Sequence, residues 1–322
     1  MDLRQGLSGI AAEHRLDVAA VRRLEELAGL HAEPQALSTW LPRGVAVLAA
    51  ALGGLGIVFW IAANWATLGR FGRFALLQAF VVAMCAGALW KPAARPPLGL
   101  LALLAIGALF AYFGQTYQTG ADPWQLFAAW AVLALPLCLA SRSDVLWAPW
   151  ALVVMTGISL WVHAHTGHRW RVQPDDLSAH LAGWAAALAL VAVLSAPLRR
   201  YTGAGVWAQR TAITLAVVMI TSTAIGGLAG GRAALHYGLG LAVLAGAAFL
   251  LARDESFEIF GLSAVALGID TLLVGGLVYL LFQRSGNDWF FSLLLTGLAA
   301  AGLVAATVSF LLRLSRRHGA QP

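Results

Sequence analysis

The chain has 322 residues, of which 60% are hydrophobic and only 11% are charged. Soluble domains carry roughly 25% charged residues, so this composition excludes a soluble globular protein. The formal net charge of +6 at pH 7 does not indicate a nucleic-acid partner, because the basic residues are dispersed over short loops instead of forming one patch.

The first 42 residues are polar and amphipathic, and we expect them to form a cytoplasmic pair of short helices. Asp17 is placed to cap a helix that runs through Val18 and Leu27 and ends near Gly29. Amphipathicity shows only that one face of a helix is buried. Two interpretations therefore stay open: a cap that packs on the membrane bundle or on a second copy of the chain, and a module that binds another protein.

Ten apolar runs fill the rest of the chain, and each is long enough to cross the roughly 30 Å hydrocarbon core of a bilayer. These runs exceed the roughly ten residues of a barrel strand, and a helix satisfies its own backbone polar groups in lipid. The sequence therefore predicts an all-α, polytopic transmembrane helix bundle. The predicted spans are 44–65, 74–90, 97–115, 124–141, 144–162, 178–198, 211–229, 234–252, 260–282 and 289–313.

The distribution of basic residues predicts the orientation of the bundle. With the N-terminus in the cytoplasm, fifteen of the 21 basic residues fall on the cytoplasmic side, as the positive-inside rule demands. Lys91 is the only lysine, which together with the heavy use of Ala, Gly and Leu indicates a GC-rich bacterial genome. We therefore expect a protein of the bacterial inner membrane with both termini in the cytoplasm. Tryptophans near the span ends support these boundaries, because indole favours the headgroup zone: Trp40, Trp90, Trp147 and Trp207 on the inner side, and Trp65, Trp124, Trp161 and Trp289 on the outer side.

Two outer hairpins have similar sequences, which indicates an internal repeat. The first reads GALFAYFGQTYQTGADPW at 107–124, and the second reads GGLVYLLFQRSGNDW at 275–289. Six spans separate them, so the sequence predicts a parallel duplication of spans 1–4 as spans 7–10. Convergent hairpin sequences are the alternative, because the match is short. The expected domains are the helix pair 1–42, a first membrane unit 43–145, connecting spans five and six in 146–210, and a second membrane unit with a basic tail in 211–322.

Two segments carry a resemblance to a known family. One is Ile61–Trp65 (IAANW), followed by a basic turn at Arg70 and Arg73, and the other is GALFAYFGQTYQTGADPWQLFAAWAVLALPL at 107–137. Together they resemble the bacterial membrane proteins grouped as domain of unknown function 2157, over roughly residues 8–145. The resemblance implies a multi-pass inner-membrane protein with a short soluble helical segment in front. It implies no mechanism, because the family has no agreed activity.

Asp270 is the sharpest candidate for a functional residue. It lies near the middle of the ninth predicted span, about 15 Å from either surface at 1.5 Å per residue. A carboxylate at that depth costs about 2.5–3.5 kcal/mol on insertion scales, so such acids usually face a cavity or pair with another group. Two hypotheses stay open: a proton- or cation-coupling group, and a neutral acid that hydrogen-bonds a neighbouring helix, for example at the Thr221–Ser222–Thr223 cluster of span seven.

The two similar hairpins supply a second candidate site. Amide and acidic side chains near a membrane surface suit the binding of a lipid headgroup or a small polar solute. The candidate substrate-binding residues are Asn64, Gln115, Tyr117, Asp122, Gln283 and Asp288. The alternative is that the Asn and Asp residues only cap helices and close turns. We therefore expect function chiefly from Gln115 and Gln283, which end apolar spans with few local partners.

The loop after span five, HAHTGHRWRVQPDDLSAH, is rich in histidine and aspartate. Zinc accepts such ligands, and the weak candidates are His163, His165 and His168. No standard metal-ligand spacing is present, so we expect titratable loop residues in solvent and no bound metal or cofactor. Asp144, Asp254, Glu255 and Glu258 lie at cytoplasmic span ends, where we expect helix caps and surface ion pairs.

Catalytic motifs are missing from the sequence, which holds no GxxxxGK[ST] loop, no nucleophile elbow and no HExxH helix. We therefore expect no enzyme; a membrane enzyme acting on a lipid-linked substrate is the least favoured alternative. The leading hypothesis is a proton- or cation-coupled transporter or a lipid-handling protein, with Asp270 as the protonatable group and a polar site near Gln115 and Gln283. The alternative is a non-catalytic assembly subunit. The expected partners are the lipid bilayer and either another membrane protein or a second copy of the chain.

Overall fold

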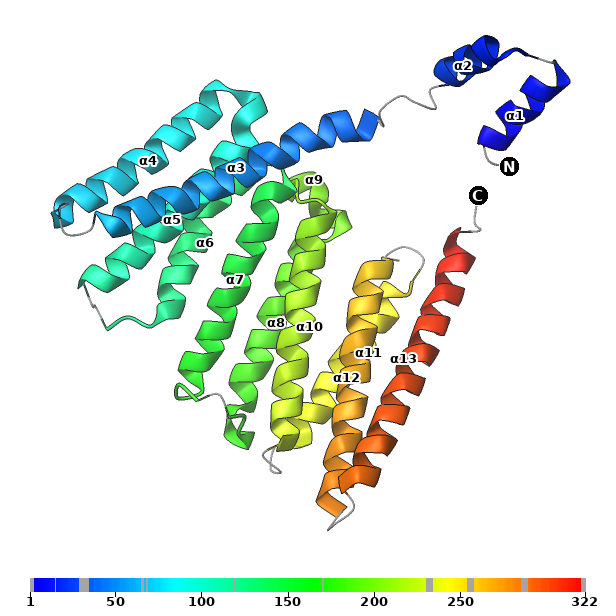
Figure 1. The fold of residues 1–322 in the computed structure, drawn as a ribbon. Coiled ribbons are helices and arrows are strands. Elements are labelled where there is room, and N and C mark those ends of the chain that lie inside the picture. The colour runs from blue at the N-terminus through cyan, green and yellow to red at the C-terminus, as the bar shows by residue number, and fades with distance from the viewer. Residues whose placement is uncertain are drawn as a thin grey trace. The chain divides into compact units, whose positions relative to one another are not determined.

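The computed structural model describes most of the chain, and over the described residues the protein consists of helices without strands (Figure 1). These residues are 3–14, 16–28, 35–64, 67, 69–117, 120–169, 171–229, 234–253, 258–284 and 289–319. The chain forms two compact units, Met1–Leu52 and Gly53–Pro322, and the boundary between them falls inside helix α3 (Gln35–Ala63).

The first unit contains the predicted helix pair, α1 (Leu3–Glu13) and α2 (Val18–Leu27), followed by the first part of α3. Asp17 caps α2, because its Oδ1 accepts a hydrogen bond of 2.8 Å from the backbone N–H of Ala20. The predicted cap is therefore confirmed, whereas the predicted helix end at Gly29 lies outside the described residues.

Ten of the described helices are long and apolar enough to cross a membrane, which confirms the predicted number of spans. They are α3, α4 (Arg70–Trp90), α5 (Arg95–Tyr117), α6 (Pro123–Ser141), α7 (Asp144–His165), α8 (Leu177–Val193), α10 (Val206–Ala229), α11 (Ala234–Leu251), α12 (Ile259–Arg284) and α13 (Trp289–Gly319). The shorter helical segments between them are η1 (Pro92–Ala94), η2 (Pro174–Asp176), η3 (Ala196–Leu198) and α9 (Arg199–Thr202). The protein is therefore a multi-pass, all-α membrane protein.

Two span boundaries differ from the prediction. We expected the sixth span to reach residue 198, but α8 ends at Val193 and a 3-10 turn follows. The physical reason is Pro197, which lacks a backbone N–H and disfavours helical geometry at the residue before it. The fifth span is longer than predicted, because α7 continues to His165 and so places His163 on a helix instead of in a loop.

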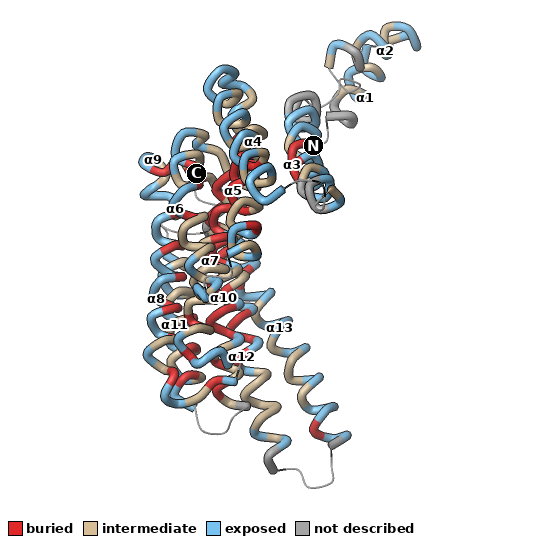
Figure 2. Tube along the Cα trace, turned by 90° about the vertical axis from the view of Figure 1, so that its left-hand side faces the viewer, coloured by how far each residue is buried: buried red, intermediate tan, exposed pale blue. Residues whose placement is uncertain are grey.

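Within the second unit, the spans form a series of packed neighbours that centres on α10 (Figure 1). Helices α4, α5, α6 and α7 pack in chain order, α7 and α8 both contact α10, and α11, α12 and α13 follow on from α10. Burial agrees with this order, because 50% of the α10 span is buried, against 6% of the α4 and α13 spans (Figure 2). Helix α10 is thus the central element of the described part of this unit.

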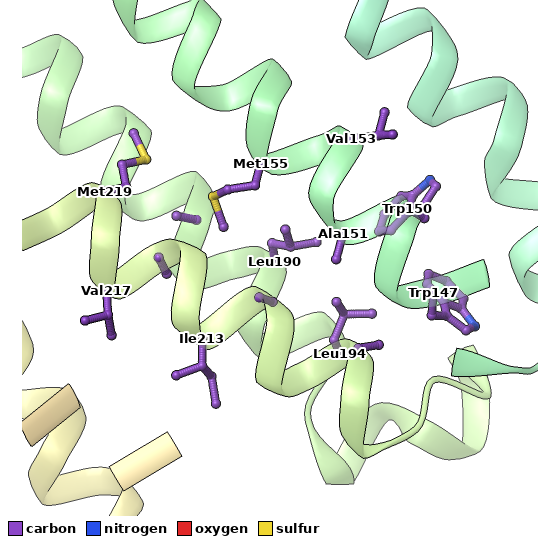
Figure 3. Close-up of a cluster of buried hydrophobic side chains, with 14 of the residues drawn as sticks. Trp147, Trp150, Ala151, Val153, Met155, Leu190, Leu194, Ile213, Val217 and Met219 are labelled. Carbon is purple, nitrogen blue, oxygen red and sulfur yellow. The ribbon is translucent and has the colours of Figure 1, made fainter. Parts of the chain in front are cut away.

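The main core of the second unit lies where α7, α8 and α10 meet (Figure 3). Met155 of α7, Leu190 of α8 and Ile213 of α10 are buried there. Small side chains on α10 let the neighbouring backbones approach closely. The buried small residues of α10 are Ala208, Ala212, Ala216 and Ala224.

The tryptophans at the predicted inner span ends differ in exposure. Trp40, Trp90 and Trp207 are exposed, as the anchoring role predicted for them requires. Trp147 is only 1% exposed and packs edge to face on Trp150, with the ring centroids 5.1 Å apart. The prediction that Trp147 anchors the protein in the headgroup zone is therefore wrong, because its ring belongs to the core.

Acidic side chains fix helix ends at the predicted cytoplasmic side. Asp144, the first residue of α7, accepts hydrogen bonds of 2.6, 2.9 and 3.3 Å from three backbone N–H groups at the start of α10. Glu258 precedes α12 and forms an ion pair of 2.8 Å with Arg210 of α10. These contacts confirm the prediction of caps and ion pairs at these two acids. Asp254 and Glu255 lie outside the described residues.

The aligned glycines of the predicted internal repeat lie in different surroundings. A Cβ atom at Gly107 would overlap the ring of Trp130 in α6, so this glycine permits close packing within its own hairpin. A Cβ atom at Gly275 would lie 3.5 Å from Ile225 of α10, which is ordinary contact with a helix outside the hairpin. The parallel duplication stays a prediction.

Candidate functional site

A crevice of about 500 Å³ lies between α7, α8, α10 and the connection from α7 to α8. We call it the amphipathic crevice. Its polar lining residues are Thr156, Ser159, His163, Thr166, Arg169, His180, Ser222 and Thr223. Its apolar lining residues include Leu152, Met155, Leu215 and Val218. Gly183 of α8 allows the three helices to close around it, because a Cβ atom there would overlap Val162 of α7 and Met219 of α10.

Polarity changes along the length of the amphipathic crevice. Helices α7 and α10 run in the same direction, since the single span α8 separates them. Along α7 the lining begins at Leu152 and reaches His163, which at 1.5 Å per residue covers about 16 Å. Along α10 it changes in the same sense, from Leu215 to Thr223. One end is therefore aliphatic, and the other carries hydroxyls, imidazoles and a guanidinium.

The polar end is organised by the turn that follows α7. The hydroxyl of Thr166 donates to the carbonyl of His163 at 3.1 Å, and Thr166 is itself buried. The Nε of Arg169 donates to the carbonyl of Thr166 at 3.2 Å. These hydrogen bonds hold Arg169 at the crevice. Neither ion pair in the described part of the chain involves Arg169, so no acidic side chain there neutralises its charge.

His180 of α8 is buried at the same end. Its Nδ1 lies 2.9 Å from the carbonyl oxygen of Asp176, and because a carbonyl only accepts, Nδ1 carries the hydrogen of this bond. The His180 ring also packs edge to face on His236 of α11, with centroids 5.1 Å apart. These contacts fix the imidazole orientation and place it in the crevice wall.

A second crevice, of about 390 Å³, lies between α6, α7 and α8. Trp124 and Trp161 form its walls, and small residues such as Ala128, Gly157 and Ala182 line it. The His165 ring stacks on Trp161, with centroids 4.1 Å apart. Its lining is apolar throughout, so it offers shape without the polar groups that orient a ligand.

Tyr117, one of the predicted binding residues, lies in an aromatic cluster of α4 and α5. Its ring centroid is 5.8 Å from that of Phe74 and 4.9 Å from that of Phe113, and the Arg70 guanidinium carbon lies 5.9 Å from the Tyr117 ring centroid. Aromatic side chains with an arginine at a span end are typical of membrane-interface anchors. Tyr117 also lines an open hollow of about 530 Å³ with Phe74 and Gln78, so its binding role stays a prediction.

Three other predicted binding residues lie at separate places on the helix ends. The side-chain amide of Asn64 donates to the carbonyl of Trp60 at 2.9 Å, which satisfies the C-terminal end of α3. Asp122 precedes α6 but makes no capping bond, and its Oδ1 lies 3.1 Å from Nε2 of His168. Gln115 is exposed on α5. None of the three lines the amphipathic crevice.

The structure does not bring the two similar hairpins together. Helices α7, α8 and α10 lie between the α5–α6 hairpin and the α12–α13 hairpin (Figure 1). The shared outer pocket that we expected from Gln115 and Gln283 is therefore not formed by these hairpins. The side chain of Gln283 and the whole of Asp288 lie outside the described part of the chain.

Asp270 is buried in α12 with 6% exposure, as its position in the sequence led us to expect. Its Oδ1 accepts a hydrogen bond of 3.0 Å from the hydroxyl of Thr307 in α13. The hydroxyls of Ser222 and Thr223, which we considered as partners, bond instead to the carbonyl of Met219 in their own helix. Asp270 lines none of the crevices described above.

The three candidate histidines make different contacts, although the rings of His163 and His168 pack edge to face with their centroids 5.5 Å apart. His163 lines the amphipathic crevice, His165 stacks on Trp161, and His168 contacts Asp122. Within the described ranges, no three His, Cys, Asp or Glu side chains gather closely enough to hold a metal ion. The histidines in and beside the connection from α7 to α8 therefore make individual contacts with neighbouring segments.

Comparison with known proteins agrees with the family resemblance. A family model described as Predicted membrane protein (DUF2157) matches residues 10–147. This confirms the likeness expected over roughly residues 8–145. No curated protein and no solved structure matches the chain. Because the family match ends at the start of α7, every residue that lines the amphipathic crevice lies beyond it.

Sequence reasoning did not find the amphipathic crevice, although part of the signal was present. Thr156, Ser159 and His163 are spaced by three and four residues, which places them on one face of a helix. Polar side chains on a single face of a span indicate a helix contact or a water-filled cavity. The sequence alone does not show that α10 faces this polar stripe, because more than fifty residues separate the two lining segments.

Proposed function

We propose that this protein handles lipid, and that it binds an amphipathic molecule in the amphipathic crevice without chemically changing it. The observation that carries the proposal is the polarity gradient along α7 and α10, from Leu152 and Leu215 to His163 and Thr223. A hydrocarbon chain suits the aliphatic end, because the side chains that line it offer the same apolar contacts as neighbouring acyl chains. A polar headgroup suits the other end, which lies on the predicted outer side of the inner membrane.

Access from the bilayer supports the same proposal. Leu152 of α7 and Val218 of α10 line the crevice and are also exposed, at 52% and 58%. In a membrane span, exposed aliphatic side chains face lipid, so a chain can enter sideways from the acyl region. A water-soluble ligand would instead require an opening lined by polar groups along its whole length.

The test is photo-crosslinking with a phospholipid that carries a diazirine on its acyl chain, added to the purified protein in detergent. We expect crosslinked peptides to concentrate in residues 152–160 and 215–219, relative to the exposed faces of α13. Val218→Trp fills the aliphatic end, and we expect it to reduce this labelling several-fold because the acyl chain no longer fits there. Val132→Trp, at a similarly exposed position of α6 outside the crevice, leaves it unchanged. Uniform labelling of all exposed spans, unaffected by Val218→Trp, would contradict the proposal.

Proton- or cation-coupled transport is a second candidate function, and the position of Asp270 favours it. A buried carboxyl beside the Thr307 hydroxyl, without an ion-pair partner among the described side chains, has the setting of a group that exchanges a proton. If this function holds, Asp270→Asn abolishes proton-coupled movement of substrate in proteoliposomes and leaves crosslinking in the crevice unchanged. Movement that persists in the variant removes Asp270 from the mechanism.

Assembly with another membrane protein, or with a second copy of the chain, is the non-catalytic alternative. Ile10, Val18 and Leu27 in the first unit favour it, because each is an exposed apolar side chain that a partner could cover. The crosslinking experiment separates the two hypotheses. A pure assembly subunit shows no enrichment of lipid in the amphipathic crevice.

A further inference from the structure

Resting on the lipid-binding function proposed above, we propose that the polar end of the amphipathic crevice selects an anionic, phosphate-bearing headgroup. The charge of the lining carries the inference. Arg169 supplies a permanent positive charge, whereas no aspartate or glutamate is among the described residues that line the crevice. A site with cationic and neutral donors and no carboxylate favours an anion over a cation.

Two acids lie close to the polar end but outside the crevice lining, and neither forms an ion pair with Arg169. Asp122 contacts His168, with 3.1 Å between Oδ1 and Nε2, and neither residue lines the crevice. Asp176 contributes its backbone carbonyl to His180, and its buried carboxyl group acts electrostatically on this imidazole from outside the crevice lining. The charge of Arg169 is therefore left available to a ligand.

The donors present match phosphate oxygens in kind. A guanidinium offers planar paired N–H groups that suit phosphate, and its Nε is already held by the Thr166 carbonyl at 3.2 Å. The hydroxyl of Ser159 extends the donor set from α7. A quaternary ammonium headgroup would instead need a carboxylate or an aromatic cage, and the described lining residues include neither.

The experiment compares three lipids with identical diazirine-labelled chains: phosphatidylglycerol, phosphatidylcholine and diacylglycerol. We expect crevice labelling to be strongest with phosphatidylglycerol, and Arg169→Gln to reduce it about tenfold, the size of one charge-assisted hydrogen bond. The labelling by diacylglycerol is unchanged in this variant. Arg171→Gln is the matched control, because Arg171 lies in the same connection and does not line the crevice.

The outcomes separate the headgroup from the chain. Equal labelling by all three lipids, with no effect of Arg169→Gln, overturns the headgroup selection and leaves the lipid-binding function standing. Absence of crevice enrichment with every lipid overturns both. Glycerol phosphate, added without a chain, distinguishes the source of the phosphate. If it displaces phosphatidylglycerol at equal concentration, the ligand is a soluble phosphate compound and the lipid headgroup is overturned.

Discussion

Most single polar side chains described here bond within their own helix or turn, but a few of them join distant helices. Asp144 begins α7 but accepts three hydrogen bonds from the start of α10, across more than sixty residues of sequence. Thr166 links His163 to Arg169 and thereby organises the polar end of the crevice. At this scale, residues that look like local caps in the sequence connect distant segments in the structure.

Removing the Asp144 carboxylate tests this link. We expect Asp144→Ala to lower the free energy of unfolding by about 2 kcal/mol, because the backbone N–H groups at the start of α10 lose a charged acceptor. Thermal unfolding of the purified protein in detergent measures the change. Asp175→Ala serves as the control, since Asp175 is exposed before α8 and its loss leaves the midpoint unchanged. An equal shift in both variants would show that general charge, and not the cap, is responsible.

Helices in the second unit approach closely where small residues face each other. A Cβ atom at Gly240 of α11 would lie 2.6 Å from the Cβ of Ala224 in α10, a distance that real side chains do not adopt. Gly238, two residues earlier in α11, has no neighbouring atoms within 4 Å of the same position. Both glycines lie in α11, but only Gly240 packs closely against α10. The same substitution at each position therefore separates the effect of packing from the effect of helix propensity.

We expect Gly240→Val to lower the free energy of unfolding by about 2 kcal/mol, the usual size of an overpacking effect, because α11 must move away from α10. Gly238→Val carries the same side chain on the same helix and keeps the stability of the parent protein. Thermal unfolding in detergent measures both. The close packing of α10 and α11 is refuted if the two variants unfold at the same temperature.

Orientation in the membrane is a property of the whole molecule, and the sequence predicts it from the basic residues. Arg142, Arg199, Arg200 and Arg210 lie near the Asp144 end of the bundle, where Arg142 donates to the Arg200 carbonyl at 2.7 Å. The amphipathic crevice lies at the opposite ends of α7 and α10. The positive-inside rule therefore predicts that the polar end of the crevice faces the outer side.

Cysteine labelling in a variant that lacks Cys85 and Cys138 tests the orientation. Ala121→Cys lies between α5 and α6, and Lys91→Cys lies between α4 and α5; both positions are exposed. We expect a membrane-impermeant maleimide to label residue 121 in spheroplasts, and to label residue 91 only after the membrane is permeabilised. The reverse pattern would place both termini outside and the crevice on the cytoplasmic side.

Hydropathy alone was enough to predict the helical class, the ten spans and the burial of Asp270, because each depends on one segment and its solvent. The cap at Asp17 was also readable, since it involves only three residues of chain. The contacts that these residues make with other helices could not be predicted from the sequence. That Asp270 meets Thr307, that Trp147 is buried and that the two hairpins stay apart depend on which helices are neighbours.

Only the tertiary structure shows which membrane spans lie next to each other, and there is a physical reason for this. In lipid, apolar side chains gain little from facing protein instead of acyl chains, so close packing of small residues decides which spans adjoin. Gly183 and Gly240 are such contacts, and each depends on residues from helices far away in the sequence. The amphipathic crevice exists only because α8 and α10 close around the polar face of α7.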